Sequence, residues 1–377
     1  MKTIKYGTST TGVALTGRGF DVMPEKIYEN LYHIFLDRIE MKAITANRKN
    51  IDVNDVSYIN KYDEEQLIIF ILTDALRPDH MSLYGYERDT TPFMKANNFI
   101  AYNDMYACET VTSRSVPCLL TNMERNDYYL SYFSKPSIFT MFKKADFYTA
   151  LLSAQGAMGA LAAGQKALSM DADYSFLNTN SEIKYDIELL EYFDKILKEN
   201  NKNKLILLHI NGSHWDYNTR FKEENALWHP LCKNFGTCSA ENFVNSYDNT
   251  ILATDMFVKS VVERVKNKNA VIYFSSDHGQ MLGEGGLRLH AQGRLNFKEL
   301  AVVPFAVWYS DKAKENIDIN TVIENRSKIT THDIIFHSIT SCAGIKSSIV
   351  DKNLSICSKD LKAAHNEFEN YISKKIE

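Results

Sequence analysis

The sequence predicts an α/β fold in which a mostly parallel sheet lies between layers of helices. The first reason is a set of short, almost wholly apolar runs, as expected of strands buried on both faces of a sheet. The second is that amphipathic helical patterns separate these runs, and this alternation favours a parallel sheet with helices on both faces. The apolar runs are Gln66–Leu72, Lys204–Ile210, Ala270–Ser275 and Val302–Trp308, and the helical patterns between them include Asp186–Asn200 and Ser239–Lys268.

The elements before the second apolar run follow in chain order. Residues 1–65 are polar, with one amphipathic helix expected over Glu25–Ala46, and we interpret them as a linker segment. A single α/β domain is expected over residues 66–377. Within it, Thr91–Asn97 predicts a short helix that begins with Pro92, a residue favoured at the first helical position. The alternating stretch Phe99–Ala107 predicts a strand.

The composition is that of a globular protein without a nucleic-acid partner. The chain has 377 residues, of which 45% are hydrophobic and 24% are charged, enough for one large α/β domain or two domains. Its net charge is −4 and it has no basic stripe, so nothing predicts binding to DNA or RNA.

The cysteines and the N-terminus give conflicting indications of the compartment. The six cysteines include two close local pairs, Cys108/Cys118 and Cys232/Cys238, and Cys342/Cys357 could form a third. Local pairs favour an oxidising compartment, and buried or free thiols in a cytosolic enzyme are the alternative. The N-terminus, however, lacks the apolar core of a secretory signal. The longest wholly apolar run, Leu67–Leu72, is far shorter than the roughly 20 residues that span a bilayer. We expect that an export or membrane segment has been lost, rather than that the chain is a soluble stand-alone form.

Three of the buried runs end in residues that can bind metals. Gln66–Leu72 leads into Asp74, Lys204–Ile210 leads into His214, and Ala270–Ser275 leads into Asp277 and His278. In sheets of this kind, ligands bind beyond the carboxyl ends of the strands. A single Asp or His after a strand is usually a turn, cap or surface residue, but three such strand ends together predict a zinc or manganese site.

A candidate nucleophile lies in the stretch Ala107–Leu119, which reads ACETVTSRSVPCL. Thr112 stands in a run of hydroxyl residues between Cys108 and Cys118, at the expected start of a helix, where backbone N–H groups favour an anion. Alone, the stretch is more typical of a helix cap beside an ordinary disulfide. A threonine hydroxyl needs a metal or a base to become a nucleophile. Together with the strand-end residues, Thr112 predicts a metal-dependent site for phosphoryl transfer.

In this combination the motifs resemble those of phosphoethanolamine transferases, which belong to the alkaline phosphatase-like superfamily and include enzymes that modify lipid A and confer polymyxin resistance. The resemblance covers about residues 66–351. The motifs that carry it are Asp74 with Arg77-Pro-Asp-His and Tyr84-Gly-Tyr-Glu-Arg-Asp-Thr-Thr-Pro92, Cys108-x-x-x-Thr112-x-x-Ser115-Val-Pro-Cys118, Gly212-Ser-His214, Cys232…Cys238 with Asn245-Ser-Tyr-Asp-Asn-Thr250, Ser276-Asp-His-Gly279 through Leu282-Gly-Glu284 to Leu289-His290, and His332-Asp-Ile-Ile-Phe-His337.

The resemblance implies an alkaline phosphatase-like three-layer sandwich and a role for each matching residue. Thr112 is the implied nucleophile, and it joins Asp74, Asp277 and His278 as a ligand of one tightly bound Zn²⁺. His214 and His290 are the implied pair that contacts the substrate phosphate, assists proton transfer or binds a second zinc. The two local cysteine pairs correspond to disulfides of the family, which supports an oxidising compartment.

The implied reaction transfers phosphoethanolamine from phosphatidylethanolamine, through a covalent phospho-threonine, to lipid A, lipopolysaccharide core or another surface glycan. The implied setting is the membrane surface on the periplasmic face of the bacterial inner membrane, with the chain a monomer. Three features depart from the family pattern. Asp74 stands where Glu is usual, the N-terminal membrane region is missing, and Ser153–Lys166 does not align, so Gln155 and Lys166 are only candidates for substrate contact.

Several alternatives remain. A sulfatase requires Cys or Ser followed by Pro two residues later and Arg four residues later, which neither Cys108 nor Thr112 provides. A phosphatase, phosphodiesterase or phosphoglycerol transferase on the same fold fits the same metal ligands. A catalytically silent accessory module is the alternative from a different class.

Overall fold

The computed structural model describes residues 48, 51, 53–59, 64–125, 127, 131–156, 163–199, 202–289 and 297–364. The predicted helix Glu25–Ala46 and the candidate site residue His290 lie outside these described residues.

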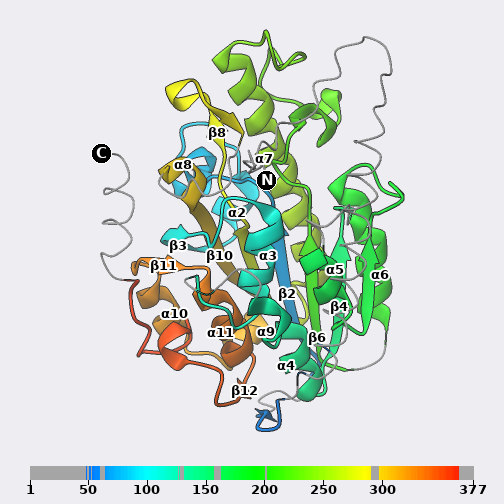
Figure 1. Cartoon of the computed structure of the whole chain (residues 1–377), viewed down its shortest axis with the longest axis vertical. Helices are drawn as coiled ribbons and strands as arrows, with labels where there is room; N and C mark the ends of the chain where they lie inside the picture. Colours follow the sequence, from blue (N-terminus) through cyan, green and yellow to red (C-terminus); the bar gives the residue numbers. More distant parts are fainter. Residues whose placement is uncertain are drawn as a thin grey trace, which may run out of the picture.

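The fold is built on an eight-stranded sheet. Figure 1 shows how its strands and the surrounding helices are arranged. Strand β10 is antiparallel to both of its neighbours, β3 and β7, and the other pairings are parallel. The predicted mostly parallel sheet is therefore confirmed. In spatial order the strands are β11 (Thr330–Thr331), β3 (Ile100–Tyr106), β10 (Val302–Tyr309), β7 (Asn269–Ser276), β2 (Gln66–Thr73), β6 (Lys204–His209), β4 (Tyr148–Ser153) and β5 (Tyr174–Leu177).

Both faces of this sheet are buried, which explains the continuous apolar runs in the sequence. Successive side chains of a strand point to opposite faces. In β2, Ile68 and Phe70 pack into one hydrophobic cluster, whereas Ile69 and Ile71 pack into the other. Each face of the central strands is thus covered by apolar side chains, as expected of strands between two helical layers.

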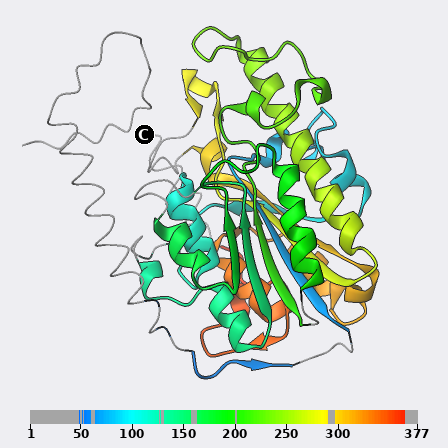
Figure 2. The same ribbon diagram turned by 90° about the vertical axis from the view of Figure 1, so that its right-hand side faces the viewer.

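The helices form two layers that cover the two faces (Figures 1 and 2). Helices α3, α4 and α11 contribute to the cluster with Ile68, and α2, α6 and α7 contribute to the cluster with Ile69. The α-helices are α2 (Pro92–Ala96), α3 (Thr112–Leu120), α4 (Ile138–Lys144), α5 (Ala163–Ser169), α6 (Leu190–Lys198), α7 (Ala240–Val265), α8 (Lys298–Ala301), α9 (Asp311–Lys314), α10 (Ile319–Asn325) and α11 (Asp333–Cys342).

Smaller elements complete the fold. Strand β1 (Ser57–Tyr58) pairs antiparallel with β12 (Ile345–Lys346), so residues ahead of Gln66 also pack on the domain. Strands β8 (Met281–Leu282) and β9 (Arg288–Leu289) form a short antiparallel pair beyond β7. Among the described residues, no helix has the length and apolar character needed to cross a bilayer.

Candidate active site

The site is formed where two neighbouring parallel strands end. Strands β2 and β7 pair up to Thr73 and Ser276, so the residues that follow them, Asp74 and Asp277, emerge side by side. His278 comes next in the chain. The side chains of Asp74, Asp277 and His278 are wholly buried, and one ligand atom from each lies within 4.8 Å of the others. The parallel register thus brings together two of the three strand ends that the sequence singled out.

Among these three side chains, hydrogen-bond acceptors outnumber hydrogen-bond donors. The Nδ1 atom of His278 lies 2.8 Å from the carbonyl oxygen of Gly279, and that carbonyl can only accept, so Nδ1 carries the proton. The other ring nitrogen, Nε2, faces the carboxylates of Asp74 and Asp277 at 3.7 and 3.6 Å. Asp74 Oδ1 and Asp277 Oδ2 are buried without a hydrogen-bond partner among the described residues. A cation would balance this arrangement, and two carboxylates with an imidazole suit zinc.

The charged groups of this cluster are buried, so each strongly affects the pKa values of the others. Burial disfavours the charged form of Asp74, yet the neighbouring His214 and His278 hold the pKa of its carboxyl below the ordinary value. Burial and the negative charge of Asp74 raise the pKa of Asp277. Burial also opposes the charge of His278, but the two carboxylates raise its pKa. The two carboxylates therefore require nearby positive charge to be ionised together, and a proton on His278 or a bound metal ion can supply it.

Thr112 completes the cluster from the start of α3. It is the first helical residue, and the N-cap, Val111, has no side chain able to cap. The Thr112 hydroxyl does not cap the helix either: its Oγ1 donates to Asp74 Oδ2 at 3.0 Å and lies 3.4 Å from His278 Nε2. The structure therefore places this hydroxyl as a fourth oxygen or nitrogen donor around the point where a metal ion would bind.

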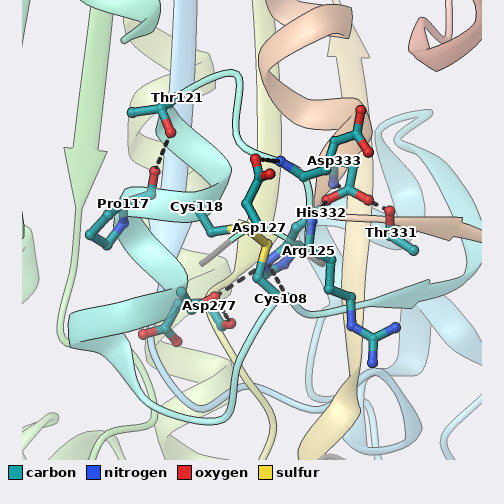
Figure 3. The surroundings of a disulfide bond; sticks show 12 residues. Cys108, Pro117, Cys118, Thr121, Arg125, Asp127, Asp277, Thr331, His332 and Asp333 are labelled. Carbon is teal, nitrogen blue, oxygen red and sulfur yellow. Dashed lines mark hydrogen bonds between the residues drawn. A yellow bond between two sulfur atoms is a disulfide. The ribbon is translucent and has the colours of Figure 1, made fainter. Parts of the chain in front are cut away.

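The start of α3 is also held by a disulfide and by hydrogen bonds to the end of β7, and Figure 3 shows the surroundings of the disulfide. A disulfide joins Cys108 to Cys118, across the stretch that contains Thr112. Ser115 Oγ, one turn after Thr112, donates to the backbone carbonyl of Asp277 at 2.5 Å. The buried ring of His332 also lies here, between Cys108 and Ser276. The other cysteines form the disulfides Cys232–Cys238 and Cys342–Cys357.

The two polar candidates from the unaligned stretch lie in different places. Gln155, two residues after β4, donates from Nε2 to Asp74 Oδ2 at 2.8 Å. It therefore contacts a candidate metal ligand directly. Lys166 lies on α5 and is exposed to solvent.

Histidines on and after β6 lie close to the cluster. His214 is half-buried, and its Nδ1 contacts the carbonyl oxygen of Trp215. Its charge lowers the pKa of Asp74, which places it within electrostatic range of the cluster. His209, the last residue of β6, is buried beside Ser153, and burial lowers its pKa to about 4 against the opposing effect of Asp74. Sequence reasoning missed His209 because it lies inside an apolar strand pattern.

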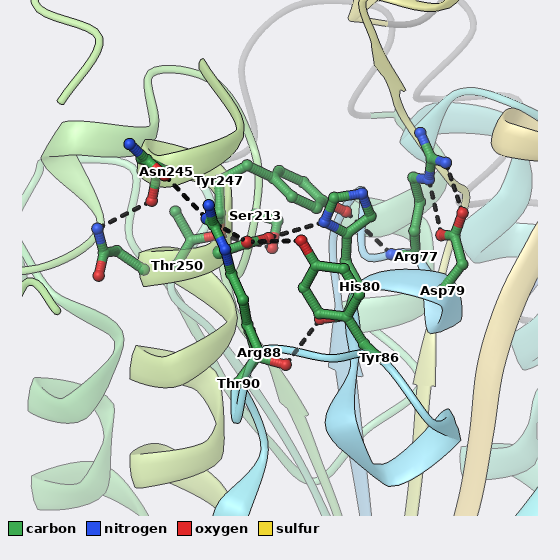
Figure 4. A network of polar contacts seen from close by, with 12 residues as sticks. Arg77, Asp79, His80, Tyr86, Arg88, Thr90, Ser213, Asn245, Tyr247 and Thr250 are labelled. Atoms are coloured by element: carbon green, nitrogen blue, oxygen red, sulfur yellow. Dashed lines mark hydrogen bonds and ion pairs between the residues drawn. The ribbon is translucent and has the colours of Figure 1, made fainter. Parts of the chain in front are cut away.

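A second polar network holds the segment that follows β2 (Figure 4). Arg77, almost wholly buried, forms ion pairs with Asp79 and Glu284, each at 2.6 Å. Further along, the buried Asp248 of α7 accepts from three side chains. His80 Nδ1 lies at 2.7 Å, Tyr86 Oη at 3.0 Å and an Arg88 terminal nitrogen at 2.9 Å. The motif residues around positions 77–88 thus fasten the strand end that carries Asp74 to α7.

Comparisons with known proteins identify the family of the chain. The sequence profile of the sulfatase family matches residues 66–345. Among curated proteins, the Kdo(2)-lipid A phosphoethanolamine 7''-transferase of Escherichia coli (strain K12) is 30% identical over 262 residues, which cover 67% of this chain and 46% of that protein. The chain spans about half the length of the curated relatives it matches.

Solved structures show the same fold. The soluble domain of lipooligosaccharide phosphoethanolamine transferase A from Neisseria meningitidis has a TM-score of 0.73 and 24% identity, and the match covers 80% of this chain and 95% of that one. The C-terminal periplasmic domain of EptC from Escherichia coli, in complex with zinc, has a TM-score of 0.71 and 23% identity, covering 83% and 91%. The predicted alkaline phosphatase-like fold is confirmed.

Proposed function

The chain belongs to the sulfatase family, and we propose that within this family it transfers phosphoethanolamine from phosphatidylethanolamine to a cell-surface acceptor. The curated relatives with which it aligns are named as transferases of this group, which supports the reaction class. One observation carries the proposal for this chain: the Thr112 hydroxyl lies 3.0 Å from Asp74, at the edge of a buried cluster of metal-ligating side chains.

Membership of the sulfatase family does not make the chain a hydrolase of sulfate esters. Sulfatases need a Cys or Ser with Pro two residues later and Arg four residues later, from which formylglycine is formed. Ser115 comes closest, because Pro117 follows at the right distance, but Leu119 stands where Arg is required. The residue at the cluster itself is Thr112, which cannot be converted to formylglycine.

We propose that Asp74, Asp277, His278 and Thr112 hold one zinc ion. When bound, zinc would stabilise negative charge on the reacting oxygens and make the threonine hydroxyl easier to deprotonate. The Thr112 proton already points to Asp74 Oδ2. Gln155 donates to the same oxygen and so restricts the orientation of that carboxylate. The hydroxyl is therefore held in one direction before substrate arrives, which favours reaction by proximity.

The reaction proceeds in two steps. Thr112 Oγ1 attacks the phosphorus of phosphatidylethanolamine and passes its proton to the acceptor oxygen it already contacts, Asp74 Oδ2. The bond from phosphorus to the diacylglycerol oxygen breaks, and diacylglycerol leaves after taking up a proton. The half-buried His214 lies near the cluster and is our candidate for supplying that proton. In the second step a hydroxyl or phosphate oxygen of the acceptor attacks the phospho-threonine, and Thr112 regains its proton.

The remaining details follow from the resemblance. We propose lipid A, lipopolysaccharide core or another surface glycan as acceptor, the periplasmic membrane surface as the place of work, and a monomer as the working form. A second zinc held by His214 and His290 also belongs to the proposal. Lys166, exposed on α5, remains a candidate for substrate contact.

The test is the covalent intermediate. The zinc-loaded chain is incubated with phosphatidylethanolamine in detergent, and its intact mass is measured. We expect the mass of one phosphoethanolamine to be added, located on the peptide that contains Thr112. Thr112→Ala should not form the adduct, whereas Thr112→Ser keeps a hydroxyl and should form it more slowly.

Two outcomes would contradict the proposal. An undiminished adduct in Thr112→Ala would remove Thr112 from its role as nucleophile. Faster turnover of a simple phosphate monoester than of the lipid diester, without an adduct, would favour a phosphatase on the same fold.

A further inference from the structure

His332 connects the segment that carries the nucleophile to the segment that carries two of the metal ligands. It immediately precedes α11 and its side chain is wholly buried. Its ring reaches two strand ends at once. On one side the backbone N–H of Cys108, after β3, donates to Nδ1 at 3.2 Å. On the other side Nε2 lies 3.0 Å from the carbonyl oxygen of Ser276, the residue before Asp277.

These two contacts assign the proton on the ring. A backbone N–H can only donate, so Nδ1 must accept from Cys108 and carries no proton. A carbonyl can only accept, so Nε2 carries the proton and donates to Ser276. Ser115 Oγ lies 3.3 Å from Nδ1, but its shorter contact assigns its own proton to the Asp277 carbonyl. His332 is therefore a neutral bridge with one acceptor and one donor, both in use.

We propose that His332 is a positioning residue, whose ring fixes the distance between Thr112 and the strand end that carries Asp277 and His278. The inference rests on the proposed function, because it gives His332 a role in the reaction of Thr112. It does not make His332 a catalytic residue, since its contacts are with backbone groups and Ser115 rather than with the reacting oxygen.

The disulfide cannot perform this task. Cys108 and Cys118 both belong to the stretch that leads into and through α3, so their bond stiffens that stretch internally (Figure 3). Connection to the end of β7 is made by the ring of His332 and by the bond from Ser115 to the Asp277 carbonyl. Because small displacements at a reacting centre lower rates steeply, losing the His332 bridge should affect the chemical step more than folding.

Two substitutions separate the two halves of the bridge. In His332→Asn, the side-chain oxygen can take the place of Nδ1 and accept from Cys108, but the side chain is too short to reach Ser276. In His332→Gln, the amide nitrogen can take the place of Nε2 and donate to Ser276, but the acceptor for Cys108 is lost. Each variant keeps one contact, so each should fold while the connection across the site is broken.

A matched control lies on the same helix. His337 is also buried, and its Nδ1 also accepts a backbone N–H, that of Asp351 at 3.1 Å. Its partner, Asp351, comes after α11 in the sequence. It belongs to none of the segments that hold Thr112 or the proposed metal ligands. His337→Asn therefore reproduces the loss of a buried imidazole without touching the bridge.

The experiment measures the rate of adduct formation at Thr112 against donor concentration, in the zinc-loaded full chain. We expect both His332 variants to lower the maximal rate at least tenfold while the donor concentration for half-maximal rate changes less than twofold. His337→Asn should keep the wild-type rate per folded molecule. As a second readout, the chain is loaded with cobalt, whose visible absorption reports ligand geometry. The His332 variants should bind cobalt with a weaker and shifted spectrum, and His337→Asn should match the wild type.

The outcomes are distinguishable. If wild type forms no adduct, the proposed function fails, and the cobalt spectra alone then decide whether His332 orders the site. If wild type forms the adduct and both His332 variants keep its rate and its spectrum, the positioning role is overturned. The role is also overturned if His337→Asn lowers the rate as much as they do. Should both His332 variants fail to fold, Ser115→Ala breaks the neighbouring connection, and a wild-type rate and spectrum in it would contradict the inference.

Discussion

Asp248 and the pair Asp74 and Asp277 are wholly buried carboxylates that differ in how their oxygens are satisfied. Both oxygens of Asp248, on α7, accept hydrogen bonds, one from His80 and the other from Tyr86 and Arg88. Figure 4 labels these three donors. Asp74 and Asp277 are equally buried, and each keeps one oxygen without a hydrogen-bond partner among the described residues.

The difference separates a structural network from a site. Leaving a buried acceptor unsatisfied costs free energy, so a protein that lacks a ligand there is less stable than it could be. Side chains of the protein, among them the cation Arg88, satisfy both oxygens of Asp248, so this network requires no added ligand. Around Asp74 and Asp277, by contrast, the donors Thr112 and Gln155 both reach Asp74 Oδ2, and one oxygen of each carboxylate stays without a hydrogen-bond partner among the described residues, so an added cation would complete this pair.

The largest expected effect is on zinc binding by Asp277→Asn. The amide has the same size but removes one of the two negative charges, so zinc affinity should fall by more than about 100-fold, beyond what loss of a supporting contact costs. Metal analysis and competition with a chromogenic chelator measure it. A full equivalent of tightly bound zinc in this variant would break the comparison, because the unsatisfied cluster would then not be the metal site.

A smaller effect on the same site is expected from Gln155→Met. The substitution keeps the length of the side chain and removes the N–H that donates to Asp74 Oδ2. Zinc affinity should fall about tenfold, since such contacts orient the ligand without binding the metal. The same chelator competition measures it, with Lys166→Met as the control on the exposed face of α5. Equal affinities in all three proteins would mean that Gln155 does not orient Asp74.

In the satisfied network, Asp248→Asn should act on stability alone. It leaves the hydrogen-bond donors of His80, Tyr86 and Arg88 imperfectly paired and should lower the free energy of unfolding by roughly 1–3 kcal/mol. Denaturant unfolding measures this loss, while zinc content per folded molecule should stay at the wild-type value. A variant of unchanged stability that loses zinc would reverse the roles we assign to the two groups.

The smallest expected effect concerns histidines that are satisfied while neutral. Burial lowers the pKa of His332 to about 3 and of His337 to about 4, from an ordinary value of 6.5. The unfolded chain therefore takes up protons below pH 6.5 that the folded chain refuses, so stability is present above that pH and is lost as the pH falls. Each histidine should account for about 1 kcal/mol of the loss between pH 7.5 and 5.5.

Denaturant unfolding in the presence of a chelator measures this pH dependence without a contribution from zinc. His332→Asn and His337→Asn should each make the chain less sensitive to acid by a similar amount. A pH dependence unchanged in both variants would show that neither ring is held neutral by the fold.

Much of the fold could be predicted because local sequence patterns determine its main strands and helices. The runs that become β2, β6 and β7 are apolar on both faces, and the helical pattern of α7 is long enough to be unambiguous. Strands β4 and β5 were not predicted, since short strands such as Tyr174–Leu177, partly exposed, lack a continuous apolar run. The reversed direction of β10 could not be predicted either, because strand direction depends on pairing and not on composition.

The residues of the site likewise differ in whether local sequence patterns could predict them. Asp74, Asp277 and His278 follow buried strands directly, so parallel pairing was enough to bring them together. Gln155 was a weak candidate, because its contact with Asp74 joins residues from separate strands. His332 belonged to a recognised motif, but its position between Cys108 and Ser276 depends on how α11 packs, which no local pattern records.

The disulfide between Cys108 and Cys118 also bears on how the protein can be produced. It closes a loop with Thr112 inside it, while Asp74, Asp277 and His278 lie outside that loop and need no cysteine for their arrangement. A chain synthesised in a reducing cytoplasm should therefore keep three of the four proposed zinc ligands in place, while Thr112 is held less rigidly and reacts more slowly. Zinc content would then be a misleading measure of quality for a recombinant preparation, and the count of free thiols would be the informative one.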